Sequence, residues 1–194
     1  MTYIWEQLGW PNLHWDAARL SLQLADVRHR QGVLLGRMQA LGFELREEAV
    51  LRTLTQDVLK TSEIEGERLD AEQVRSSLAR RLGLDAGALA PVDRNVEGIV
   101  EVMLDATRNY DAEVTEERLF DWHAALFPTG RSGMNRIRVG AWRDDAGGPM
   151  QVVSGPVGRE RVHYTAPPAA QMPTDMAAFL DWFNAPPKTD PVLK

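Results

Sequence analysis

Apolar residues recur every three or four positions over most of the chain, a period typical of α-helices that bury one face. The first such segment runs from Asp16, a good N-cap, to Leu41, and Gly42 is placed to end it. A second begins near residue 45 with acidic residues that suit the positive end of a helix dipole, and it continues toward Ile64. The apolar face of the first helix is expected to contain Leu20, Leu24, Val27, Leu34, Leu35 and Met38.

Capping residues mark the helices that follow. Asp70 is placed to cap a third helix, and Gln73 three positions later completes the pattern of a capping box. A fourth helix is expected over about residues 94–110. Thr115, followed by two glutamates, indicates the start of a fifth helix that ends at Pro128.

Residues 130–168 break this pattern, because glycines are dense and the strand-like pieces IRVGAW, MQVVSG and RVHYTA are short. The second and third pieces, separated by a glycine-containing loop, predict a β-hairpin over about residues 149–168. Helical spacing returns at residues 174–184. The predicted fold class is mainly α, a helical bundle with one inserted β-hairpin. We expect a domain boundary between residues 1–90 and residues 91–194.

Composition and charge argue against several kinds of chemistry. The 194 residues include no cysteine, which excludes disulfides, thiolate metal ligands and a cysteine nucleophile. The four histidines lack the short spacings of metal ligands, so no metal site is expected. A net charge of -6 argues against a nucleic-acid partner, which requires a surplus of Lys and Arg on one face. The arginine-rich stretch RSSLARRLG is interpreted as the solvated side of an amphipathic helix.

The sequence also favours a cytoplasmic protein without a membrane partner. No apolar run reaches the length of about 18 residues that a membrane span requires. The N-terminus has neither the basic start nor the apolar core of a secretory signal.

Several residues with chemical potential have a structural interpretation. His123 shares a helical face with apolar residues and is interpreted as a hydrogen-bonded core histidine rather than a catalyst. His163 is interpreted as a surface residue of the hairpin. Trp5, Trp10 and Trp15 are interpreted as anchors that hold an irregular arm to the helices.

One carboxylate has an unexpected place in the second helix, which is expected over about residues 46–66. At about 100° per residue, with Val50 as zero, Leu54 lies at about 40° and Glu65 at about 60°, so Glu65 falls within the apolar stripe. A buried charge is costly unless a cation or several donors meet it. Two interpretations stay open. Either Glu65 has a specific partner, or the helix frays next to Gly66 and the side chain turns to water.

Three segments of the sequence carry a family resemblance. TSEIEGE fits a pattern of Ser or Thr, three residues, Glu and Gly at Thr61, Glu65 and Gly66. LFDWHAALFPTG is followed by IRVGAWRDD, which contains Gly140, Trp142 and Arg143. MQVVSG and VHYTAPP are expected to form a hairpin that ends in a proline pair, Pro167 and Pro168. In this order they resemble the Fic family, whose members typically transfer AMP from ATP to a protein hydroxyl. The opening segment resembles an uncharacterised domain commonly found ahead of Fic cores.

The resemblance implies roles for two segments. The end of the second helix, with Thr61, Ser62, Glu65 and Gly66, would be inhibitory, and Glu65 would pair with a family arginine outside this chain. The hairpin would be a flap that docks an extended segment of a target protein by strand addition. ATP and Mg²⁺ would be cofactors of the full-length parent, and neither is expected on this chain alone. A homodimer is left open. The flap residues are expected to be Val152, Val153, Val162, His163 and Tyr164.

One departure from the family limits the expectation. The defining sequence, His-Pro-Phe-x-x-Gly-(Asn/Asp)-Gly-Arg, is absent from the 194 residues. In the family it supplies the general base and the nucleotide-binding loop, so no catalytic residue is expected in this chain, and adenylyltransferase activity is expected of the parent. The final residues, DPVLK, resemble the first turn of another helix, so we expect a polypeptide truncated before that motif. The alternative is a non-catalytic helical module that binds a partner protein.

Overall fold

The structure is a computed structural model that describes residues 2–12, 14–84, 89–156 and 158–187. The chain divides into two compact units. The first comprises Met1–Arg28 with Ala141–Lys194, and the second comprises His29–Gly140. The boundary expected near residue 90 lies within the second unit. The final segment DPVLK, interpreted above as a helical turn, lies outside the described residues.

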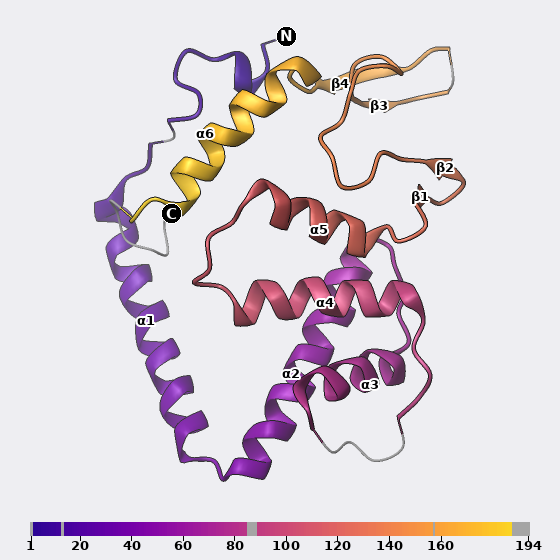
Figure 1. The fold of residues 1–194 in the computed structure, drawn as a ribbon. Coiled ribbons are helices and arrows are strands. Elements are labelled where there is room, and N and C mark those ends of the chain that lie inside the picture. Colours follow the sequence, from indigo (N-terminus) through magenta and orange to yellow (C-terminus); the bar gives the residue numbers. More distant parts are fainter. Residues whose placement is uncertain (1, 13, 85–88, 157, 188–194) are drawn as a thin grey trace. The chain divides into compact units, whose positions relative to one another are not determined.

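The described residues are mainly helical, with two small antiparallel hairpins, which confirms the predicted fold class (Figure 1). None of the described helices is both long and apolar enough to cross a bilayer. The helices are α1 (Ala17–Ala40), α2 (Phe43–Ile64), α3 (Ala71–Leu82), α4 (Arg94–Arg108), α5 (Glu116–Leu126) and α6 (Met172–Asn184). The remaining elements are η1 (Ile4–Glu6), η2 (Ala169–Gln171), β1 (Arg131–Ser132), β2 (Asn135–Arg136), β3 (Gln151–Ser154) and β4 (Arg161–Thr165).

The caps that the sequence indicates are formed. A side-chain oxygen of Asp16 accepts from the backbone N–H of Arg19 at 3.1 Å. Asp70 accepts from two backbone N–H groups of the first turn of α3, each at 2.9 Å. The capping box is not completed, however, because the Gln73 side chain instead bonds to Asp93. A residue twenty positions away therefore takes the place of the local partner.

The core of the second unit lies among α2, α3 and α4, and α5 packs on α4. In Figure 1, α3, α4 and α5 lie in succession and α2 crosses the first two. The apolar face of α3 is the best buried of the unit. The buried apolar side chains are Leu51, Val58, Val74, Leu78, Ala79, Val96, Val100 and Leu104.

Two predictions, one for IRVGAW and one for Trp5 of the N-terminal arm, are wrong. IRVGAW is irregular rather than a strand. Its backbone does not join a ladder at Gly140, which has a φ of 64° and donates its N–H to Nδ1 of His123 at 3.3 Å. This bond confirms His123 as a hydrogen-bonded histidine, although its side chain is half-buried rather than part of the core. Trp5 contacts the hairpin rather than a helix, because its indole N–H donates to the carbonyl of Thr165 at the end of β4.

Candidate functional site

The C-terminus of α2 ends in a tight, fully bonded turn. Glu65 is the C-cap, and Gly66 follows with a φ of 85°. The N–H of Gly66 donates to the carbonyl of Glu63 at 3.0 Å, and the N–H of Glu67 donates to the carbonyl of Ser62 at 2.9 Å. These two bonds are those of a Schellman motif, which favours glycine at the left-handed position. Gly66 thus ends the helix and fixes the backbone beside Glu65.

The side chain of Glu65 is exposed, so the placement of this carboxylate on a buried face is wrong for the described chain. Val58 is 0% exposed and Ser62 is 7% exposed. The buried face of α2 therefore passes through Ser62, at about 120° on the wheel used above, rather than through Glu65. Thr61, like Glu65, is exposed.

The nearest cation along α2 is already engaged. Lys60 Nζ lies 2.6 Å from an oxygen of Glu63, one turn along the helix. This hydrogen bond and the charge of Lys60 lower the pKa of Glu63. Within the described part of the chain, Glu65 makes no ion pair or side-chain hydrogen bond. The turn therefore presents a carboxylate that is available to a partner.

Strands β3 and β4 form the predicted hairpin. They pair antiparallel, with Val152 opposite Tyr164 and Val153 opposite Val162. The register shifts between Val152 and Val153, so His163 is the extra residue of a bulge in β4. Such bulges are common next to functional sites because they redirect side chains.

The expected flap residues are mostly open to solvent. Val152, Val153, Val162 and His163 are exposed, whereas Tyr164 is half-buried. The exposure of His163 confirms its interpretation as a surface residue of the hairpin. Its Nε2 lies 2.7 Å from Oγ of Ser154 on β3. The hairpin thus presents a short two-stranded surface whose apolar side chains are available for contact.

Arg143 connects the Gly-x-Trp-Arg stretch to the proline pair that closes the hairpin. Its guanidinium donates to the carbonyl of Pro167 and to a carboxylate oxygen of Asp145. The other oxygen of Asp145 accepts from the backbone N–H of Ala169 at 2.7 Å. One ion pair therefore fixes the chain on both sides of the hairpin, a role that nothing in the local sequence pattern indicates.

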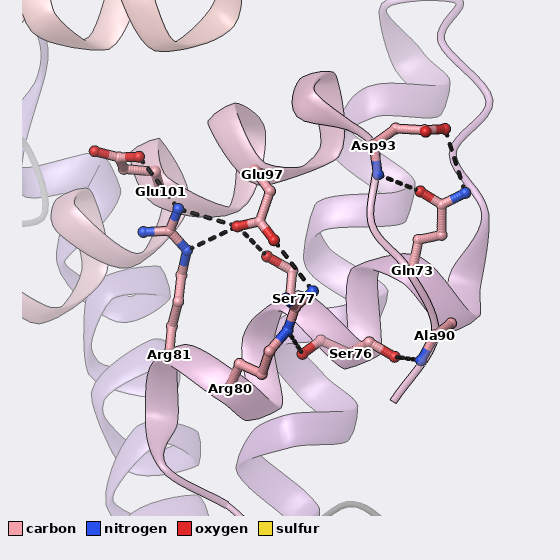
Figure 2. A network of polar contacts seen from close by, with 9 residues as sticks. All are labelled: Gln73, Ser76, Ser77, Arg80, Arg81, Ala90, Asp93, Glu97 and Glu101. Carbon is pink, nitrogen blue, oxygen red and sulfur yellow. Dashed lines mark hydrogen bonds and ion pairs between the residues drawn. The ribbon is translucent and has the colours of Figure 1, made fainter. Parts of the chain in front are cut away.

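A polar network joins α3 to α4, and Figure 2 shows its side chains converging from the two helices. The carboxylate of Glu97 accepts from Ser77 at 3.0 Å, from Arg80 at 3.2 Å and from Arg81 at 3.1 Å. Arg81 also reaches Glu101. Two arginines of RSSLARRLG, Arg80 and Arg81, therefore join α3 to α4.

A second cluster closes the turn between α4 and α5. The carboxylate of Asp105 accepts from Arg118, Trp122 and Asn109, each at 2.7 Å. The hydrogen bond from Asn109, followed by that from Arg118, lowers the pKa of Asp105. The Arg118 side chain is only 14% exposed and lies over the Trp122 ring. Its remaining hydrogen bonds go to the carbonyls of Asp105, Asn109, Ala112 and Glu113.

These clusters are suited to holding helices together rather than to binding a metal. Residues 2–12, 14–84, 89–156 and 158–187 contain no group of three His, Asp or Glu side chains placed to hold an ion. No buried side-chain nitrogen or oxygen in the same ranges lacks a hydrogen-bond partner. The candidate site is therefore sought at the exposed carboxylate at the end of α2 and at the hairpin.

Comparison with known proteins identifies one segment. Residues 3–84 match a family described as a domain of unknown function, DUF4172. The match covers less than half of the chain and contains the N-terminal arm and α1 to α3, with Glu65. A search of the curated proteins gives no match.

Proposed function

We propose that this chain is the regulatory and target-docking portion of a Fic-type protein adenylyltransferase that acts in the cytoplasm. In this role the end of α2 inhibits the enzyme and the β3–β4 hairpin docks the protein to be modified. The resemblance of the three quoted segments supports this role, and the match of residues 3–84 to a domain of unknown function is compatible with it. We assign no residue of this chain to ATP or Mg²⁺.

The single observation that carries the proposal is the carboxylate of Glu65. It stands on a backbone fixed by two hydrogen bonds, at the end of a helix whose last turn buries Ser62. It is exposed and has no ionic partner among the residues described. An exposed carboxylate on a fixed backbone is suited to bind an arginine from another segment, because charge-assisted pairs are among the stronger hydrogen bonds.

Inhibition would then be competition for one cation. In a Fic-type site an arginine holds the γ-phosphate of ATP, while a protein hydroxyl attacks the α-phosphate and pyrophosphate leaves. If Glu65 binds that arginine, the nucleotide loses the contact that aligns it for in-line attack. The exposed position of Glu65 suits this role, since the carboxylate must reach a segment outside α2.

The hairpin supports the docking half of the proposal. A two-stranded sheet leaves backbone N–H and C=O groups on its outer edges, and an extended peptide can pair with them. Val152 and Val153 are exposed on β3, where they can contact the side chains of an added strand. Backbone pairing would fix the position of a target hydroxyl with little dependence on the sequence of the target protein.

Proline at Gln151 tests this docking. Gln151 and Thr165 form a pair whose N–H and C=O groups point outward, because the neighbouring Ala166 N–H bonds to the carbonyl of Met150. In a longer protein that contains the His-Pro-Phe motif, Gln151→Pro should abolish target modification while leaving ATP binding intact. Gln151→Ser, which keeps the N–H, is the matched control and should remain active. Equal modification by the two variants would rule out strand addition on β3.

The rival is a non-catalytic module that binds a partner protein through the same hairpin. The exposed valines of the hairpin favour it as much as they favour a flap. The coding sequence beyond Lys194 separates the two, because a His-Pro-Phe motif in frame supports the transferase and an immediate stop codon supports the module.

A further inference from the structure

The N-terminal arm lies against the end of the hairpin. The indole N–H of Trp5 donates to the carbonyl of Thr165 at 2.9 Å, and the Tyr3 hydroxyl lies 3.4 Å from Oγ1 of the same residue. The Tyr3 ring also meets the ring of Tyr164 edge to face, with centroids 5.3 Å apart. A segment about 160 positions away in sequence therefore contacts the last two residues of β4.

The contact occupies an outward backbone group on the β4 edge of the hairpin. In the Gln151–Thr165 pair the backbone groups of both residues point away from the partner strand. Trp5 uses the outward carbonyl of Thr165, so an added strand would compete with the indole for that group on β4. The outward groups of Gln151 on β3 receive no hydrogen bond from the described residues. An incoming strand therefore finds its pairing groups on β3.

The arm also builds one wall of a groove of about 370 Å³ next to the start of β3. Tyr3 and Trp5 stack with ring centroids 6.3 Å apart and an interplanar angle of 15°. Gly148 and Pro149, which lead into β3, line the same groove, so it lies at the end of the hairpin where β3 begins. Pro167 and Pro168 complete the apolar part of the lining.

The chemistry of the lining favours an apolar, proline-containing occupant. Stacked aromatic rings beside prolines form the kind of surface that accepts extended polyproline segments. No lysine or arginine among the described residues lines the groove, and its two carboxylates accept hydrogen bonds. Glu6 accepts from the backbone N–H of Tyr3 at 2.7 Å, and Asp145 accepts from Arg143 and Ala169. Both oxygens of Asp145 are therefore occupied, whereas Glu6 uses one of its two oxygens.

We propose that residues 3–6 are part of the docking site: the arm closes the edge of β4, directs the target strand to β3, and selects targets with a proline beside that strand. This role rests on the proposed docking function. The arm lies at the start of the segment that matches a domain of unknown function, and the proposal gives it a part in substrate choice.

Nuclear magnetic resonance of the nitrogen-15 labelled chain tests the role. The probes are acetylated decapeptides of alternating Thr and Val that carry a Pro-Pro pair at one end or the other, each with an Ala-Ala counterpart. All probes are expected to shift the amide resonances of β3. Only one of the two Pro-Pro peptides, the one whose prolines lie at the end next to the groove, should also shift the Trp5 indole resonance. That peptide should bind roughly five- to tenfold more tightly than its counterpart.

Two variants complete the test. Trp5→Ala should remove the preference for Pro-Pro, and Trp10→Ala, a change outside the groove, should keep it. If the β3 amides shift with every probe but Trp5 does not respond and no preference is found, the role of the arm is wrong and the docking function stands. If no probe shifts the β3 amides, strand addition itself fails.

Discussion

Gly98 of α4 lies so close to Ala125 of α5 that a Cβ on Gly98 would stand 1.9 Å from the Ala125 carbonyl oxygen. The obstacle is backbone, so it cannot move aside as a flexible side chain would. The absence of a side chain at this one position allows the two helices to approach each other, and α5 in turn carries His123, which holds Gly140.

Gly98→Ala should therefore destabilise the second unit. Forcing the helices apart should cost about 3 kcal/mol in the free energy of unfolding, as measured by urea titration followed by circular dichroism. The matched control is Gly36→Ala in α1, where a Cβ would meet no atom within 4 Å. That change should stabilise the chain by about 0.5–1 kcal/mol, because alanine favours the helix. Similar effects of the two changes would contradict the close approach.

Removal of the carboxylate at position 97 should weaken the α3–α4 contact more than removal at position 101. Glu97 has three side-chain donors and is 31% exposed, whereas Glu101 is 59% exposed and receives one donor from Arg81. We expect Glu97→Ala to lower the free energy of unfolding by about 1–2 kcal/mol and Glu101→Ala by less than about 0.5 kcal/mol. Equal losses in urea titrations would show that the network of Figure 2 contributes only surface charge.

Stability at acidic pH should depend on Asp105. Its pKa is lowered from an ordinary value of 3.8, first by the hydrogen bond from Asn109 and then by that from Arg118. A lowered pKa in the folded state gives stability that is complete above the ordinary value and is lost as the pH falls through the folded-state pKa. Asp105→Asn should thus be less stable than the native chain at pH 7, and this difference should shrink as the pH falls below 3.8. A difference that stays constant with pH would contradict the assignment.

Local signals in the sequence predict most of this fold. Asp16 and Asp70 cap helices because their side-chain oxygens reach N–H groups two or three residues away, and Gly66 and Gly83 end helices because they adopt positive φ. The hairpin is likewise local, with two short strands around a glycine-containing loop. Such features need no knowledge of distant residues.

Features that depend on distant residues could not be predicted from these patterns. The bond from Trp5 to Thr165 and the exchange of bonds between Gln73 and Asp93 have no counterpart in local spacing. The placement of Glu65 was wrong for another reason. Val50, the zero of the wheel and one edge of the expected stripe, is 41% exposed, and the buried face of α2 is centred nearer Leu51, Val58 and Ser62.

The transfer of AMP by a Glu65 variant tests the central claim most directly. In a longer protein that contains the His-Pro-Phe motif, Glu65→Gly should raise the incorporation of label from ATP into protein at least about tenfold, equivalent to about 1.4 kcal/mol. Glu67→Gly, which removes an exposed carboxylate just beyond Gly66, should leave incorporation at the native level. Equal incorporation by the native protein and both variants, all folded to the same extent, would contradict an inhibitory role for Glu65.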